Sequence, residues 1–246
     1  MKKFHFSLIV KSILLILVLV TSGCAISGNY SGIYNPEDPY EKSNRRVYEF
    51  NKKLDEAFLR PLSEFYETAT PDPAQVAITN FFSNLDDIRI SINSLLQGKV
   101  VNSLSDITRF FINTIFGLGG FFDVATEMGL EKHNEDFGQT LAKWGAKPGP
   151  YLMLPFLGPS NVRDSFTFVG DTALAPAISL DNNRARLGLV SLDLINTYTA
   201  FSGLAEIESQ DEYAFLRDAY LEARKYEVND GISEEDLLDD EDFEDF

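Results

Sequence analysis

Few residues in this chain of 246 could do chemistry, and histidine is the first to consider. Beyond residue 24 there is one histidine, His133, in the segment EKHNEDFG. A Ser-His-Asp hydrolase could use it, but the G-x-S-x-G elbow of many lipid hydrolases is missing. A metal site made of His133, Glu135 and Asp136 would lack a second histidine. We therefore expect His133 to be a solvated loop residue, and we predict no catalytic residue, no metal and no cofactor.

The one cysteine, Cys24, follows a basic start, an apolar run and a few small residues, which is the pattern of a secretory signal. The small residues before it are similar to the lipobox of bacterial lipoproteins, in which the cysteine becomes an acylated N-terminus. In that resemblance, Ala25 in place of aspartate favours the outer membrane. We predict a lipoprotein signal peptide over residues 1–23, lipid attachment at Cys24 and a tether over residues 24–35. The alternative is a secreted protein with one free thiol.

The charge of the chain is strongly negative, at −17, and it is unevenly spread. Nine carboxylates and no base lie between Glu234 and Asp245. A segment of this composition cannot bury enough apolar surface to fold, so residues 231–246 are predicted to be a disordered acidic tail. The net charge excludes nucleic acid as an expected partner.

Apolar side chains recur at helical spacing through most of the remaining chain. The signals for helix starts and ends are Asp38-Pro39-Tyr40-Glu41, Asp72-Pro73-Ala74-Gln75 and Ser209-Gln210-Asp211-Glu212 at starts, and Arg60-Pro61 and Gly98 at ends. No pair of alternating strands joined by a tight turn is evident. We therefore predict an all-α fold with one domain over residues 36–230.

Residues 104–116, LSDITRFFINTIF, carry apolar side chains well beyond one stripe. Such a helix is either central in a core or exposed to lipid, and the sequence alone weighs the two equally. The helix is expected to stop at Gly117, Gly119 and Gly120. These glycines are candidates for a hinge, or form a helix cap and a turn.

The stretch from residue 144 to residue 164, WGAKPGPYLMLPFLGPSNVRD, is apolar but interrupted by four prolines. No long helix tolerates that spacing, and a regular strand fares little better. The prediction is a long irregular apolar loop. Within it, Tyr151 is either a buried tyrosine or a residue that lines a binding site, and Arg163 is either a partner of loop carbonyls and charges or a phosphate ligand.

Five ordered segments of the sequence resemble the VacJ-type lipoproteins, also called the MlaA family. They are PEDPYEKSNRRVYEFN, NFFSNLDDIRISINSLLQGK, RFFINTIFGLGGFFDVA, EDFGQTLAKWGAKPGPYLMLPFLGPSNVRD and DEYAFLRDAYLEARKYE. The resemblance covers nearly all of residues 36–230 and leaves out the acidic tail.

The resemblance implies a ring-like helical domain seated in one leaflet of the outer membrane, on its periplasmic side. A central amphipathic channel would let mislocalised phospholipid pass inward to a soluble periplasmic carrier, and a trimeric porin would be a partner. Candidate channel contacts are Phe50, Asn51, Tyr151 and Arg163. No reaction is implied. The rival classes are a lipid hydrolase using His133 and a purely structural lipoprotein.

Overall fold

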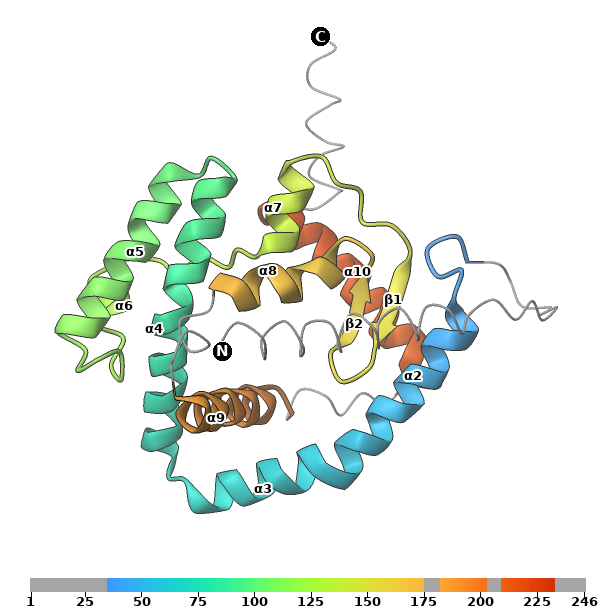
Figure 1. Ribbon diagram of the computed structural model, residues 1–246, viewed down its shortest axis with the longest axis horizontal. Coiled ribbons are helices and arrows are strands. Elements are labelled where there is room, and N and C mark those ends of the chain that lie inside the picture. Colours follow the sequence, from blue (N-terminus) through green and yellow to red (C-terminus); the bar gives the residue numbers. More distant parts are fainter. Residues whose placement is uncertain (1–34, 175–181, 203–208, 233–246) are drawn as a thin grey trace, which may run out of the picture. The chain divides into compact units, whose positions relative to one another are not determined.

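The computed structural model describes residues 35–174, 182–202 and 209–232 (Figure 1). The chain divides into two compact units, residues 1–39 and residues 40–246. In the first unit the described residues form a turn, in which the Asp38 N–H donates to the Asn35 carbonyl oxygen at 3.2 Å. Cys24, the predicted signal peptide and nearly all of the tether and the acidic tail lie outside the described residues. Everything that follows concerns the second unit.

The second unit is mostly helical, which confirms the all-α prediction apart from one small sheet. In chain order its described elements are α2 (Glu41–Leu54), the π-helical segment η1 (Asp55–Leu59), α3 (Arg60–Ala69), α4 (Asp72–Leu96), α5 (Val100–Ile115), α6 (Val124–Glu127), α7 (Phe137–Lys143), β1 (Tyr151–Leu154), β2 (Gly158–Asn161), the 3-10 helix η2 (Asp164–Phe166), α8 (Thr167–Leu174), α9 (Asn183–Ser202) and α10 (Glu212–Val228). Among the described helices, none is long and apolar enough to cross a bilayer.

The first helical segment does not end at Arg60-Pro61, contrary to the sequence prediction. The chain continues from α2 through η1 into α3, where Pro61 lies in the first turn. Proline is tolerated there because the N–H groups of a first helical turn have no carbonyl partner within the helix. The wider π turn shifts the backbone register just before it. The helical path therefore bends at η1 instead of stopping (Figure 1).

Several predicted helix starts and boundaries are also wrong in detail. The N-cap of α2 is Tyr40 and that of α4 is Pro71, and neither makes a side-chain capping bond. In α10 the cap is Asp211, whose carboxylate accepts from the Ala214 N–H, and not Ser209. The two apolar runs before Gly98 form the single helix α4. Packing against neighbouring helices holds these ends where the local capping signals are unused.

The stretch predicted to be an irregular loop contains a β-hairpin. Strands β1 and β2 pair antiparallel, with Tyr151 opposite Asn161 and Leu154 opposite Gly158. The tight turn between them places Phe156 and Gly158 at positive φ, 67° and 81°. Pro159 is compatible with this sheet because both strands of a two-stranded sheet are edge strands, so a missing N–H breaks no central ladder.

The buried apolar cluster lies between the hairpin, α2 and α10. Its fully buried members are Tyr151, Met153 and Tyr213. The Tyr151 and Tyr213 rings meet edge to face with centroids 6.3 Å apart, and Tyr220 packs on Tyr151 at 5.9 Å. This cluster makes the hairpin part of the core and not a free loop.

Candidate functional site

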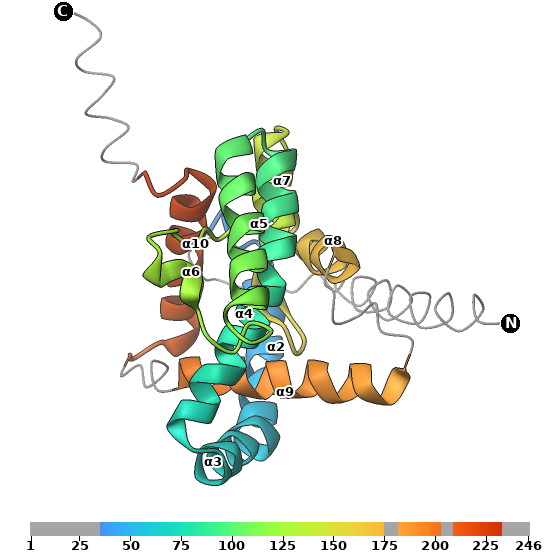
Figure 2. The same ribbon diagram turned by 90° about the vertical axis from the view of Figure 1, so that its left-hand side faces the viewer.

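The distribution of polar and apolar side chains on α5 is the reverse of that on a surface helix of a water-soluble protein. The buried residues of α5 are all polar: Ser103, Asp106, Arg109 and Asn113. Its exposed residues include large apolar side chains, Val101, Leu104, Phe111 and Ile115, and the exposed Phe116 follows directly after its end. The polar face packs on α4, which lies alongside it (Figure 2).

The polar interior between α4 and α5 is centred on Arg109, whose side chain is 1% exposed. Its Nη2 donates to both carboxylate oxygens of Asp123 at 3.0 Å, and its Nη1 donates to the Leu130 carbonyl. The Nε atom lies 3.8 Å from Asp87, which Lys132 also binds. Charges are stable in such a place only when they are paired, and here the described residues supply the partners.

Helices α3 and α9 repeat the inversion. Between them, Ser63 Oγ lies 2.8 Å from Thr199 Oγ1, and the Tyr66 hydroxyl donates to Asn196 Oδ1 at 2.8 Å. Their exposed large apolar side chains are Phe58 just before α3, Leu62 and Phe65 on α3, and Leu187, Val190 and Leu194 on α9, beside exposed charged residues such as Glu64, Glu67 and Arg184. Polar contacts inside and apolar side chains outside are therefore a property of two separate helix pairs.

We call the exposed apolar side chains of α3, α5 and α9, together with Phe58 and Phe116, the apolar exterior. Removing one such large side chain from water is worth about 1.5–3 kcal/mol. A monomeric soluble protein rarely leaves a large contiguous set of them in water. The arrangement is suited to surroundings that are themselves apolar, with the polar groups satisfied inside the protein.

Two asparagines of α2 hold the hairpin against that helix. Asn44, which is buried, accepts from the Met153 N–H at 3.0 Å and donates to the Tyr151 carbonyl at 3.1 Å. Asn51 donates to the Leu154 carbonyl and accepts from the Phe156 N–H, both at 2.9 Å. Each amide thus satisfies one donor and one acceptor of the hairpin main chain.

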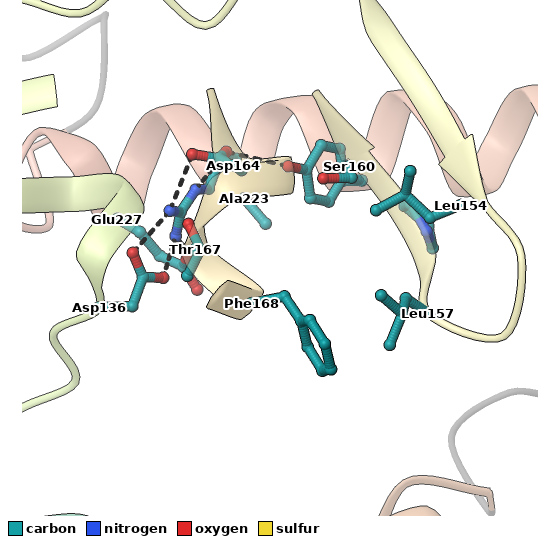
Figure 3. Close-up of a pocket in the computed structure, with 12 residues that line it drawn as sticks. Asp136, Leu154, Leu157, Ser160, Asp164, Thr167, Phe168, Ala223 and Glu227 are labelled. Carbon is teal, nitrogen blue, oxygen red and sulfur yellow. Dashed lines mark hydrogen bonds and ion pairs between the residues drawn. The ribbon is translucent and has the colours of Figure 1, made fainter. Parts of the chain in front are cut away.

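A cavity of about 380 Å³ lies where the hairpin, α8 and α10 meet (Figure 3). Its lining residues are Asp136, Leu154, Leu157, Pro159, Ser160, Asp164, Thr167, Phe168, Tyr220, Ala223, Arg224 and Glu227. Figure 3 shows Leu154, Leu157 and Phe168 around its open part and the carboxylates of Asp136 and Asp164 at the other end. The volume is at the lower end of the range for small-molecule sites. An amphipathic lining of this kind suits a molecule with a polar and an apolar part.

The polar end of the cavity is an ion cluster centred on Arg224. Its guanidinium donates to both oxygens of Asp136 at 2.7 and 2.8 Å, to Asp164 at 2.8 Å and to Glu227 at 2.8 Å. Burial opposes the charge of Asp164, but hydrogen bonds from Arg163 and Arg224 outweigh it and lower its pKa to about 2. Asp164 therefore stays ionised at neutral pH, and the cluster joins α7, η2 and α10.

The chain is similar to known proteins in sequence and in fold. A family model described as MlaA lipoprotein matches residues 36–227. The chain belongs to the MlaA lipoprotein family. An uncharacterised protein of Rickettsia felis is 38% identical over 204 residues, 81% of each chain. An Escherichia coli protein described as the intermembrane phospholipid transport system lipoprotein MlaA is 34% identical over 216 residues, 85% of this chain and 84% of that one.

A solved structure supports the same family at the level of the fold. It is described as the structural basis for maintenance of bacterial outer membrane lipid asymmetry. It aligns with a TM-score of 0.63 at 30% identity, over 78% of this chain and 98% of that chain. The helical architecture of this MlaA-family chain therefore has an experimental counterpart.

The four residues predicted to contact lipid lie apart from the cavity lining. Tyr151 has no exposed surface and packs in the core, so its ring does not line the cavity. Arg163 is buried with its guanidinium on Asp164 at 2.7 Å, so a phosphate would have to displace that carboxylate. Asn51 is engaged by the hairpin. Phe50 is half-exposed and meets Phe156 edge to face at 5.4 Å.

The three glycines proposed as a hinge lie in the turn after α5, where Gly117 and Gly120 are closely packed and Gly119 is not. Gly119 and Gly120 have positive φ, 80° and 96°. A side chain on Gly120 would collide with Asn84, and one on Gly117 with the Phe122 carbonyl. These contacts account for glycine at both positions by packing, and a hinge role stays a prediction.

His133 is half-buried rather than solvated, contrary to the sequence prediction. Its Nδ1 lies 2.8 Å from Oδ1 of Asp106, which is buried. The other two residues of the candidate metal set bind elsewhere: Glu135 pairs with Lys99, and Asp136 with Arg224. The three side chains of that set are therefore committed to separate partners.

Sequence reasoning missed Asn44 and Arg224, the residues that organise the hairpin and the cavity. The signal for Asn44 was an amide at helical spacing from Val47 and Tyr48, which pack on the buried cluster. The signal for Arg224 was a cation on a helix facing the core, but its partners Asp136 and Asp164 are 88 and 60 residues away. No local pattern identifies partners at that separation.

Proposed function

We propose that this MlaA-family chain removes phospholipids that have strayed into the outer leaflet of the outer membrane and passes them inward. The observation that carries the proposal is the inversion of α5 and of the α3–α9 pair, with paired polar groups inside and the apolar exterior outside. Relatives described as phospholipid transport lipoproteins and the structure described in terms of outer membrane lipid asymmetry support the same function.

In this proposal the apolar exterior is buried in the inner leaflet. Acyl chains contact α3, α5 and α9 and replace the water that those side chains would otherwise meet. The protein wall excludes inner-leaflet lipid from the path, so lipid enters from the outer leaflet. The cavity beside the hairpin offers leucines and Phe168 to the acyl tails of a moving phospholipid.

The anchor, location and partners proposed for the chain complete this function. Acylated Cys24 fixes it to the outer membrane with its domain on the periplasmic side, and two or more acyl chains make that attachment stable. A trimeric porin holds the domain in place, and a soluble periplasmic carrier receives the lipid. The transfer needs no cofactor and no bond cleavage by this chain.

The experiment is to measure phospholipid exposed on the surface of cells that lack the protein. We compare cells restored with the native chain, with His133→Ala and with Phe111→Asp. Surface phospholipid should rise on deletion, fall to normal with the native chain and with His133→Ala, and stay high with Phe111→Asp. No rise on deletion would overturn the transport proposal, and failure of His133→Ala despite normal folding would favour a hydrolase.

A further inference from the structure

Trp144, the one tryptophan of the chain, lies at the end of α7 with 57% of its surface exposed. Its indole Nε1 donates to the carbonyl oxygen of Leu96 at 3.0 Å, next to the end of α4. On its other side the ring meets Phe137 edge to face at 6.3 Å. The ring is therefore held in a defined orientation although it is largely uncovered.

The α4–α5 turn, whose residue Leu96 binds this ring, carries four exposed aliphatic side chains. They are Leu95 and Leu96 at the end of α4 and Val100 and Val101 at the start of α5. Figure 1 shows α7 beside that turn, and α7 contacts α4. We call these four residues and Trp144 the Trp144 patch. The patch continues into the apolar exterior along α5, where Leu104 follows.

Two lysines, Lys143 and Lys147, lie on either side of Trp144 in the sequence, and both are exposed. Within the described part of the chain neither makes a hydrogen bond or ion pair, in a protein with 38 acidic residues. Lys99, at the same turn, differs because it pairs with Glu135 and Asp230. Glu135 and Asp230 are thus already paired with Lys99, and among the described residues the ammonium groups of Lys143 and Lys147 have no carboxylate partner.

We propose that the Trp144 patch lies at the boundary between the acyl chains and the headgroups of the membrane leaflet. The aliphatic side chains and the indole ring contact the upper part of the acyl chains, and Lys143 and Lys147 bind lipid phosphates. Tryptophan concentrates at this depth because its ring is apolar with one polar edge. Lysine reaches the phosphates with its ammonium while its stem stays among apolar groups.

The inference rests on the proposed position of the domain in the membrane leaflet and adds the orientation of the domain within it. It assigns the α4–α5 turn to the headgroup level of the leaflet. Phe111 and Ile115, which belong to the apolar exterior further along α5, then lie at a different depth in the leaflet from the Trp144 patch. A surface with both unpaired cations and aliphatic groups matches an anionic lipid layer better than it matches an acidic protein, which offers no acyl chains.

The test uses Trp144 as a natural fluorescent reporter in the full lipidated protein, reconstituted into vesicles of phosphatidylethanolamine and phosphatidylglycerol. Separate preparations contain lipid brominated near the glycerol or near the chain ends. The expected result is that shallow bromines quench the Trp144 emission more strongly than deep ones. Stronger quenching by deep bromines, or full access to iodide in the water, would overturn the proposal.

A second reporter separates this inference from the function on which it rests. In the variant Trp144→Phe with Phe111→Trp, the tryptophan lies on the apolar exterior of α5. If that tryptophan is quenched by brominated lipid and Trp144 is not, the patch assignment fails and the membrane seat stands. If neither is quenched, the membrane seat itself fails. Iodide shielding of Trp144 that appears only when a porin is added would assign the patch to a protein partner and overturn it.

The lysines are tested by the double variant Lys143→Glu with Lys147→Glu. Each cation near an anionic membrane surface changes the docked-to-undocked ratio about fivefold. Shallow quenching of Trp144 should weaken in vesicles that contain phosphatidylglycerol, and the Phe111→Trp reporter should be unaffected. Quenching of Trp144 that is unchanged in the double variant would overturn the phosphate contact.

Discussion

Asn44 and Asn51 lie seven residues apart on α2, and both bind the main chain of the hairpin, Asn44 within β1 and Asn51 at the end of β1 and in the turn. Seven helical residues advance the chain by about 10.5 Å. The three strand residues from the Tyr151 carbonyl to the Leu154 carbonyl advance it by about 10 Å. Because the two spacings match, the helix and the strand satisfy each other's polar groups at two points without distortion.

The first prediction concerns Asn51→Ala. Loss of its two bonds should leave the hairpin folded on Asn44 and the core but free the turn at Phe156. The net value of a hydrogen bond is about 0.5–1.5 kcal/mol, so amide exchange at Phe156 should speed up about tenfold or more. Amide exchange followed residue by residue measures this. Unchanged exchange at Phe156 would show that the turn is held by packing alone.

Asn44→Ala should be more damaging than Asn51→Ala because Asn44 is buried. It leaves the Tyr151 carbonyl and the Met153 N–H without this partner, and each unsatisfied buried group costs about 1–3 kcal/mol. The unfolding free energy from denaturant titration in detergent should fall by about 2–4 kcal/mol. Lys42→Ala, on the exposed face of the same helix, is the control and should change it little.

Gly138 and Gly188 form a matched pair of helical glycines. A side chain at Gly138 in α7 would collide with Arg224, Asp164 and Thr167, whereas one at Gly188 in α9 would meet nothing. Gly138→Ala should therefore break the ion cluster and lower the melting temperature. Gly188→Ala should leave it equal or raise stability by about 0.5–1 kcal/mol, since alanine favours the helix. Equal effects of the two variants would contradict the close packing of Gly138 against Arg224, Asp164 and Thr167.

Asp164 should make the protein sensitive to acid. Its folded-state pKa of about 2 is below the ordinary 3.8, so its contribution is complete above about pH 4 and is lost as the pH falls toward 2. The difference corresponds to about 2 kcal/mol. Asp164→Asn should lower stability at neutral pH and flatten its dependence on pH in that window. Asp211→Asn is the exposed control, also with a pKa of about 2, and should lose less because solvent screens its pair with Arg45.

The inversion of α5 predicts opposite consequences for its two faces. Arg109→Ala removes the buried cation that binds Asp123 and the Leu130 carbonyl, and should cost about 3–5 kcal/mol of folding free energy. Phe111→Asp, on the exposed face, should affect folding far less but weaken membrane binding about a hundredfold in a chain without residues 1–24. Denaturant titration and vesicle partitioning separate the two. Tight vesicle binding by Phe111→Asp would contradict lipid contact at this face.

Much of the helical architecture follows from the sequence, but its finer boundaries do not. The periodicity of apolar residues predicts α2, α4, α5 and α10, because each helix must bury or cover one side. The continuation through Pro61 and the hairpin at residues 151–161 are not predictable in this way. Pro61 is accommodated next to a π turn and Pro159 in a two-stranded sheet. Both arrangements are stable only when neighbouring elements pack against them.

The sequence by itself determined the family, through five ordered segments, and the predicted anchor at Cys24, because such signals are local and read along the chain. Only the tertiary structure decided which faces look inward. Periodicity shows that α5 has an apolar and a polar side but not which one is covered, and that depends on whether Arg109 finds Asp123 and Asp87 across the helix pair. The same holds for Arg224 with Asp136 and Asp164, because pairing between distant residues exists only once the chain has folded.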